Sequence, residues 1–183
     1  VGRGRVFETP TYEISAVCGS HSVPCLSYVF AEKMKPGRFN VKKAEALGLA
    51  EGPLRKKIQS GKRIRLGRRI IKPSDVLGPP RLGVRIVYAT DTRPCASVTK
   101  AAKNADLLIH DCSFNESCRG KAVEYGHSTA HQAASVAKKS GAKKLILTHI
   151  GAECDDVKAL LSEARSVFPE VLVAHDLMRL EVA

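Results

Sequence analysis

One aspartate and two histidines lie where catalytic or metal-binding side chains are commonly found. Asp91 ends the run RIVYATD, in which strand-forming residues lead directly into the carboxylate. His149 follows the apolar run LILT in the same way, and His21 lies in a short loop of glycine, serine and proline residues. Open α/β sheets place binding groups at the carboxyl ends of their strands. We therefore expect these three side chains to meet at one edge of a sheet.

Carboxylate and imidazole groups are the ligands that zinc and other divalent transition metals accept in proteins. Asp91 also carries enough charge to bridge two cations that would otherwise repel each other. The alternative is that Asp91 caps the next helix or turn and that His21 is an exposed loop residue. The pairing of Asp91 with His149 at two strand ends favours the metal site.

The segment EYGHSTAH contains a further candidate, His127. Ser128 or Thr129 can cap the helix that the sequence predicts next, and His127 directly precedes this cap. At the positive end of a helix, His127 can donate a proton or a hydrogen bond to a phosphate oxygen or a leaving alkoxide. His110, His131 and His175 are interpreted as structural.

The composition favours one ordinary intracellular domain. The chain has 183 residues, of which 44% are apolar and 26% charged, and no apolar run approaches the roughly 18 residues of a membrane span. We see no signal peptide and expect a cytoplasmic protein. The six cysteines form no CxxC pair, so reduced thiols are expected instead of a structural zinc site. The first residue is Val1, which favours a fragment or a trimmed chain.

The net charge of +12 is concentrated in one segment. Residues 31–81 hold 15 lysines and arginines against four acidic residues, whereas the remainder is close to neutral. This localisation favours a nucleic-acid-binding arm over a solvated insertion without a partner. Within the segment we expect short helices over 41–47 and 53–59, a small strand pair over 62–66 and 68–72, and no core pattern.

Outside this segment, short apolar runs alternate with helical patterns. This rhythm predicts an α/β layered domain, with a longer loop between residue 110 and residue 129. The expected elements are a strand hairpin over 1–17, strands over 26–31, 84–90, 107–110, 144–147 and 171–174, and helices over 97–104, 129–140 and 155–168.

Five short motifs, in order, resemble those of ribonuclease Z, a zinc-dependent tRNA 3′-processing endoribonuclease of the metallo-β-lactamase fold. They are His21 in HSVP, Gly52-Pro53 in the basic segment, Asp91 in DTRP, His127 in HST and His149 in LTHI. The resemblance implies the C-terminal portion of a metallo-β-lactamase αββα sandwich. Residues 1–183 would then form a partial domain, with 33–80 as an inserted basic arm.

The resemblance also implies roles by position. His21 would bind the first of two zinc ions, Asp91 would bridge both, and His149 would bind the second. His127 would assist the departure of the leaving group. The arm would clamp a tRNA precursor away from the cut, and the full-length protein would be a homodimer. The candidate RNA contacts are Gly52, Pro53, Arg55, Lys56, Lys57 and Arg93.

The sequence departs from the family in three places, one of which is Gly151-Ala152-Glu153, where Ser and Arg usually follow the last ligand histidine. The 183 residues contain no HxHxDH motif, which supplies three further histidines and the general-base aspartate, and His110-Asp111 stands where a His-Glu pair is common. We therefore expect this chain alone to bind zinc weakly and not to cleave RNA. Two alternatives are a non-catalytic RNA-binding module and another hydrolase of this fold, such as an aryl sulfatase or a cyclic-nucleotide phosphodiesterase. The basic arm disfavours the latter, because a small substrate needs no such clamp.

Overall fold

The structure is a computed structural model that describes residues 3–152, 154 and 156–182. Positions 1 and 2 of the expected hairpin and Asp155, the expected start of the last helix, lie outside these ranges. Residue contacts divide the chain into two units, Val1–Glu32 with Val84–Ala183 and Lys33–Gly83. Each unit is described by itself below.

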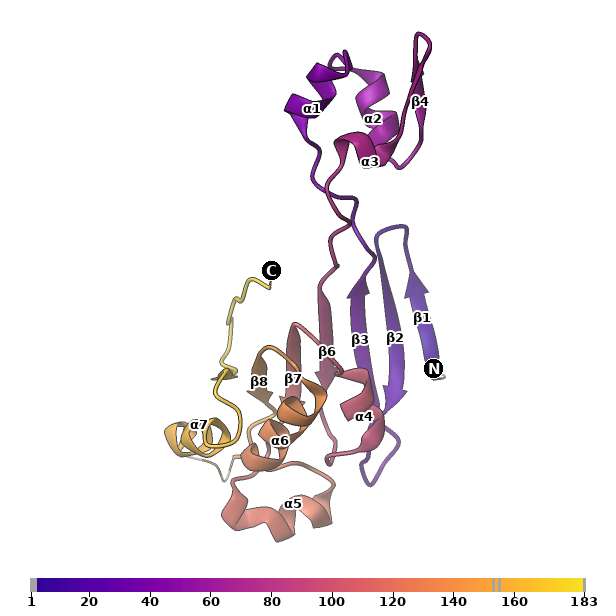
Figure 1. Cartoon of the computed structure of the whole chain (residues 1–183). Helices are drawn as coiled ribbons and strands as arrows, with labels where there is room; N and C mark the ends of the chain where they lie inside the picture. Colours follow the sequence, from indigo (N-terminus) through magenta and orange to yellow (C-terminus); the bar gives the residue numbers. More distant parts are fainter. Residues whose placement is uncertain (1–2, 153, 155, 183) are drawn as a thin grey trace. The chain divides into compact units, whose positions relative to one another are not determined.

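A seven-stranded sheet forms the centre of the first unit (Figure 1). Its order is β1-β2-β3-β6-β7-β8-β9, antiparallel from β1 to β6 and parallel from β6 to β9. Because β6, β7 and β8 are parallel, their carboxyl ends lie at the same edge of the sheet. The strands are β1 Gly4–Glu8, β2 Tyr12–Cys18, β3 Leu26–Glu32, β6 Arg85–Ala89, β7 Leu107–Asp111, β8 Leu145–Thr148 and β9 Val171–Val173.

Helices α4 (Ala96–Ala101), α6 (Ala130–Ser140) and α7 (Val157–Arg165) pack against one face of the sheet (Figure 1). The alanine-rich sequence of α6 is a strong helix former. A capping box between Thr129 and Gln132 begins this helix, and Gly141 ends it in the left-handed conformation. Among the described residues, no helix has the length and apolar character needed to cross a membrane.

Strand alternation separates a face covered by helices from a second face that is partly exposed. Val87, Leu108 and Leu147 point toward the helices and belong to the main core. Side chains one position away point to the opposite face, where Tyr28 is 37% and Tyr88 47% exposed, whereas Leu107 and Ile146 are buried. Among the described residues, helices therefore cover one face of the sheet and not the other.

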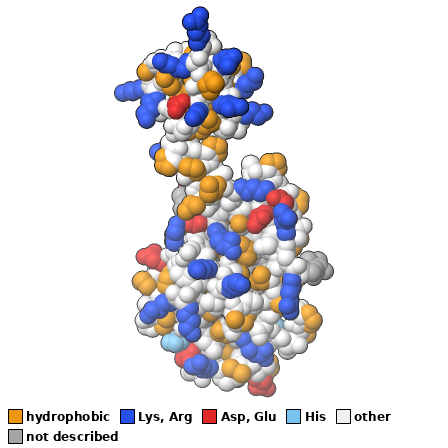
Figure 2. All heavy atoms as spheres, turned by 45° about the vertical axis from the view of Figure 1, so that its right-hand side comes forward, with side chains coloured by type: hydrophobic (Ala, Val, Ile, Leu, Met, Phe, Trp, Pro, Cys, Tyr) orange, Lys and Arg blue, Asp and Glu red, His pale blue; other side chains and the backbone are white. Residues whose placement is uncertain are grey.

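The second unit, Lys33–Gly83, has a small core of its own. Its elements are α1 Val41–Ala46, α2 Pro53–Gln59, α3 Pro73–Val76 and the hairpin β4 Ile64–Leu66 with β5 Arg69–Ile71. The expectation of no core pattern is wrong, because single apolar residues spaced between basic ones meet in three dimensions. These buried residues are Ala44, Leu49, Ile58, Ile64, Ile71 and Val76. Lysine and arginine side chains are prominent on the visible surface of this unit (Figure 2).

Two short elements occupy the loop expected between residues 110 and 129. They are a 3-10 turn, η1 (Glu116–Cys118), and α5 (Arg119–Tyr125). Only Ala122 of α5 is buried, so the sequence has no helical repeat of apolar residues that would have predicted this helix. The helix ends at Gly126, whose φ of 90° is left-handed. α5 thus leads directly into His127.

Candidate metal centre

Asp91 and His149 each follow a parallel strand in a strained backbone conformation. Their φ angles are 49° and 57°, and the other described non-glycine residues with positive φ are Asn104 and Leu177. This conformation costs an L-residue roughly 1–2 kcal/mol and is concentrated at functional sites. The strain turns both side chains toward the carboxyl edge of the sheet, where they meet.

A chain of hydrogen bonds fixes the His149 imidazole. Its Nδ1 lies 2.8 Å from Oγ of Ser113, and this hydroxyl donates to Oδ1 of Asp111 at 3.0 Å. Because the Ser113 hydroxyl donates its one hydrogen to Asp111, its oxygen can only accept a hydrogen bond from Nδ1–H of His149. In this tautomer the lone pair of the ring is on Nε2, which lies 3.0 Å from Oδ1 of Asp91. Two acceptors that face each other without a proton between them favour a cation at this position.

Oδ1 of Asp91 gives a second indication that this position suits a cation. This atom is enclosed and has no hydrogen-bond partner among the described residues, although the side chain as a whole is 48% exposed. An enclosed acceptor without a partner costs about 1–3 kcal/mol. Imidazole nitrogen and carboxylate oxygen are both zinc ligands. The donor set of Asp91 and His149 therefore fits a divalent metal ion.

Cys25 supports the strained backbone at Asp91. Its thiol donates to the Asp91 carbonyl oxygen at 3.0 Å. Burial, and then the nearby charge of Asp91, raise the pKa of the Cys25 thiol. The thiol is therefore protonated at neutral pH and keeps its role as a donor.

His127 is oriented by a buried carboxylate. Its Nδ1 lies 2.6 Å from Oδ2 of Asp111, which is fully buried. Asp111 also accepts hydrogen bonds from the amides of Thr92 and Ser113, each at 3.0 Å. A carboxylate on Nδ1–H fixes the tautomer of the ring and directs Nε2 outward. In this structure Nε2 lies 3.4 Å from Nε2 of His21.

Asp91, Asp111, His127 and His149 each place one possible ligand atom within 4.8 Å of the others. Asp111 differs from the rest because its oxygens already accept several hydrogen bonds. We therefore assign it to orient His127 and not to bind a metal. Asp111 was not among the candidate residues expected from the sequence, although it ends a parallel strand, a position comparable to those of Asp91 and His149.

His21 reaches the cluster beside His127. Its Nδ1 accepts the amide hydrogen of Val23 at 3.2 Å, which leaves the ring hydrogen on Nε2, facing His127. Metal binding through Nε2 would require the other tautomer. A Cβ atom at Gly126 would lie 2.9 Å from Cδ2 of His21, so glycine is needed for this close approach.

His110 has a structural environment. It is fully buried, its Nδ1 lies 2.9 Å from the Asp111 carbonyl oxygen, and its Nε2 has no hydrogen-bond partner among the described residues. Burial lowers the pKa of His110 from its ordinary value. The imidazole is therefore neutral and forms part of the packing behind the cluster.

The candidate RNA contacts fall into two groups. Lys56 and Lys57 are exposed on α2, whose start is set by Gly52, with a φ of 146°, and by Pro53 in the first turn. Arg55 instead points into its own unit. Its Nε donates to the Leu49 carbonyl at 3.0 Å, and its guanidinium lies 5.7 Å from the Phe39 ring centre and 3.8 Å from Glu45, with only 14% of the side chain exposed.

Arg93 belongs to the first unit and is tied to the elements around the centre. Its amide donates to the Ser20 carbonyl at 2.7 Å, and its Nε donates to the Val123 carbonyl at 2.9 Å. Arg93 therefore links the loop after β6 to the His21 loop and to α5.

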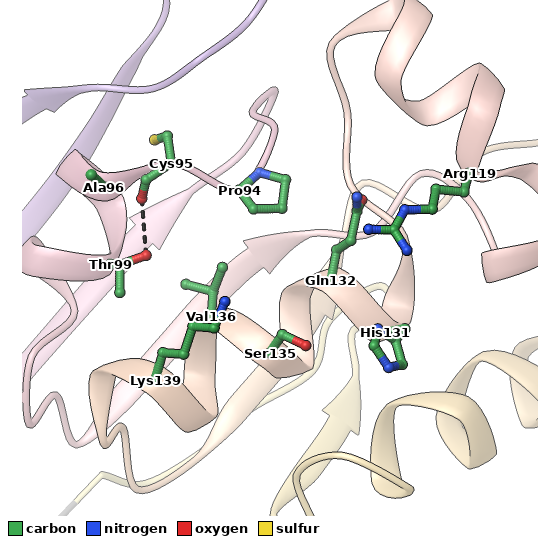
Figure 3. A pocket seen from close by; sticks show the side chains of 10 residues that line it. All are labelled: Pro94, Cys95, Ala96, Thr99, Arg119, His131, Gln132, Ser135, Val136 and Lys139. Atoms are coloured by element: carbon green, nitrogen blue, oxygen red, sulfur yellow. Dashed lines mark hydrogen bonds between the residues drawn. The ribbon is translucent and has the colours of Figure 1, made fainter.

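A separate groove of about 510 Å³ lies between the start of α4 and one side of α6 (Figure 3). Arg119, His131 and Lys139 supply its basic side chains. Arg119 also pairs with Glu116 at 2.9 Å, which reduces the positive charge that the groove offers. None of the candidate metal ligands lines it.

Comparisons with known proteins place this geometry in context. The profile described as Beta-lactamase superfamily domain matches residues 64–150. The chain is 46% identical over 180 residues to Ribonuclease Z of Methanosarcina acetivorans and 48% identical over 179 residues to that of Methanothermobacter thermautotrophicus. These alignments cover 98% of this chain but 59% and 58% of the relatives, so the chain spans about three fifths of their length.

Solved structures agree on the fold. Human tRNase Z, short form, superposes with a TM-score of 0.56 at 21% identity, covering 98% of this chain and 46% of that one. A metallo-β-lactamase fold protein from Bacillus subtilis superposes with a TM-score of 0.57 at 20% identity, covering 92% and 48%. The resemblance in fold therefore extends over nearly all of this chain and about half of each solved structure.

Proposed function

We propose that this chain forms the C-terminal part of a zinc-dependent endoribonuclease that removes 3′ trailers from tRNA precursors. The metallo-β-lactamase fold and the similarity to ribonuclease Z over nearly the whole chain support the proposal. One observation carries the proposal. The Asp91–His149 pair and the His127–Asp111 pair lie together at the carboxyl edge of one sheet.

Asp91 and His149 would hold zinc in this proposal, and His21 would join them in its other tautomer. A zinc ion held there would supply an activated water and stabilise charge on the phosphoryl group. His127, in its protonated form, donates Nε2–H to the leaving alkoxide. Asp111 accepts Nδ1–H of the same ring at 2.6 Å and stabilises the imidazolium.

The basic unit holds the RNA away from the cut. Lys56 and Lys57 supply exposed ammonium groups for phosphates, and Gly52-Pro53 sets the start of their helix. Arg55 contributes by fixing α2 to Leu49 and Phe39. Arg93 contributes by holding α5 near the centre. We further propose a homodimer and a cytoplasmic location, the latter supported by six free cysteines.

The residues of this chain supply too few ligands for two zinc ions, since the 183 residues contain no HxHxDH motif. We expect the chain alone to bind a tRNA precursor without cutting it. A chimera tests this directly: the segment of the Methanosarcina acetivorans ribonuclease Z that the chain does not match is fused to the chain and assayed with zinc.

The proposal predicts that the chimera releases the 3′ trailer and that the same chimera with Asp91→Asn does not. Cleavage by the unfused 183-residue chain would contradict the expected incompleteness of the centre. A chimera that binds the precursor but never cuts it would contradict the catalytic assignment and favour an RNA-binding module.

A further inference from the structure

Four aromatic rings, each beside the next, connect the candidate centre with Tyr125. His149 and His127 stack with ring centres 5.1 Å apart, and Phe114 lies 6.4 Å from His127. Tyr125 stacks beside Phe114 at 6.3 Å, with 16° between the ring planes. Phe114 is 9% exposed, whereas Tyr125 is 54% exposed. The row therefore ends in an aromatic ring that offers much of its surface to solvent.

Tyr125 is held by the same elements that build the centre. It is the last residue of α5, and Gly126 follows it in a left-handed conformation, packed against His21. Arg93 Nε donates to the carbonyl of Val123, within the last turn of α5. These contacts fix the backbone of Tyr125, and the Phe114 ring packs beside its side chain, so little further freedom is lost when the ring takes up a ligand.

The backbone of Phe114 is fixed as well. Its amide donates to the Ser128 carbonyl at 3.3 Å, and its own carbonyl accepts the Ala130 amide at 3.1 Å. These bonds join Phe114 to the segment between His127 and α6. The backbone of Phe114, whose ring contacts Tyr125, is therefore fixed relative to the segment that contains His127.

We propose that Tyr125 is a stacking platform for an RNA base next to the scissile phosphate. This inference rests on the proposed function and deepens it by naming a nucleotide contact of the same centre. Every base has a π face, so an exposed aromatic ring accepts any base and positions a single strand without reading its sequence. The Tyr125 ring contacts Phe114, and Phe114 in turn contacts His127, so a base stacked on Tyr125 would lie near the cut.

A thermodynamic cycle tests the contact. The 183-residue chain, without added metal, is titrated with a labelled tRNA precursor and with precursors that carry one abasic nucleotide on either side of the 3′ junction. Each titration is repeated with Tyr125→Ala and with Tyr125→Phe. For the unmodified chain, one abasic position should weaken binding by about tenfold. Tyr125→Ala should bind the intact precursor about tenfold more weakly than the unmodified chain does. For the abasic precursor, the two proteins should have the same affinity.

Tyr125→Phe should retain the affinity of the unmodified chain, because the ring and not the hydroxyl carries the stacking. Tyr88→Ala is the matched control, since Tyr88 is a similarly exposed tyrosine, 47%, on the open face of the sheet. It should leave the abasic effect unchanged. Equal abasic effects for the unmodified chain and Tyr125→Ala would overturn the stacking contact alone. Failure of the unmodified chain to bind any precursor would overturn the proposed function together with it.

Discussion

At the scale of single residues, the centre separates groups that can bind a metal ion from groups that orient them. Asp91 keeps an enclosed oxygen without a hydrogen-bond partner among the described residues, and His149 directs a lone pair at that oxygen. Asp111 and Ser113 use their polar atoms on each other and on the two histidines. This division of roles follows from donor and acceptor chemistry and predicts different effects of substitution.

Asp111→Asn removes a buried charge that accepts hydrogen bonds from His127, Thr92 and Ser113. We expect it to lower the free energy of unfolding by about 1–3 kcal/mol, because the amide group offers one acceptor where the carboxylate offered two. Urea unfolding measures the change. Asp176→Asn, at an exposed position, is the control and should stay within about 0.5 kcal/mol. Equal stability of the two variants would contradict the assignment.

His110 predicts a pH dependence of stability. Burial lowers its pKa in the folded state below the ordinary 6.5, so the unfolded chain binds the extra proton as the pH falls through that value. Neutral His110 therefore leaves the free energy of unfolding undiminished above about pH 6.5. Below that pH, protonation of the unfolded chain lowers the free energy of unfolding by at most about 1.4 kcal/mol per pH unit. Urea unfolding between pH 5 and 8 should give a shallower slope for His110→Asn than for the exposed control His175→Asn. The same slope in both would contradict the prediction.

At the scale of elements, the ends of β6, β7 and β8 bring Asp91, Asp111 and His149 to one edge of the sheet. α5 and its terminal Gly126 then place His127 among them. A side chain at Gly126 would press on His21, with a Cβ atom 2.9 Å from Cδ2. The position of the His127 loop therefore depends on one glycine.

Gly126→Ala should destabilise the protein by about 1–2 kcal/mol, because alanine resists a φ of 90° and also meets His21. Gly120→Ala is the matched control within the same helix, where an added Cβ meets nothing within 4 Å. It should stabilise the protein by about 0.5–1 kcal/mol. Thermal or urea unfolding of both variants measures the two changes. Stabilisation by Gly126→Ala would contradict the account of this loop.

The strands and the larger helices could be predicted because their apolar patterns are strong. LILT predicted β8, and the alanine-rich segment after Thr129 predicted α6. Asp91 and His149 were candidates because an abrupt polar residue follows each strand. α5 and the core of the basic unit were missed, since their buried residues are isolated between polar ones. The pairing of Asp111 with His127 was missed because it depends on a contact across 16 residues.

At the scale of the whole molecule, the chain combines a sheet unit that carries the candidate centre with a basic unit that has its own core. Residues 31–81 hold 15 of the 30 basic residues, and the remainder of the chain is nearly neutral. The proposed clamp on RNA is therefore electrostatic, and its strength must depend on salt. In the proposed function, the sheet unit would carry the catalytic centre and the basic unit would bind the RNA.

Replacing Lys56 and Lys57 together with alanine should weaken binding of a tRNA precursor and flatten its salt dependence. Each lost phosphate contact lowers the slope of log affinity against log salt by about 0.9, so the double variant should lose about 2. Lys138→Ala with Lys139→Ala, two exposed lysines on α6, is the control and should retain the original slope. Binding isotherms at several salt concentrations measure the slopes. An unchanged slope in the Lys56 and Lys57 variant would argue against the clamp.

Calorimetric titration of the 183-residue chain with zinc, beside Asp91→Asn and Asp176→Asn, tests the metal centre most directly. The account predicts weak but measurable binding by the unmodified chain, at least a tenfold loss in Asp91→Asn, and no change in Asp176→Asn, whose exposed position lies outside the cluster. Zinc binding of equal strength in all three proteins, or in none of them, would contradict a metal site at Asp91 and His149.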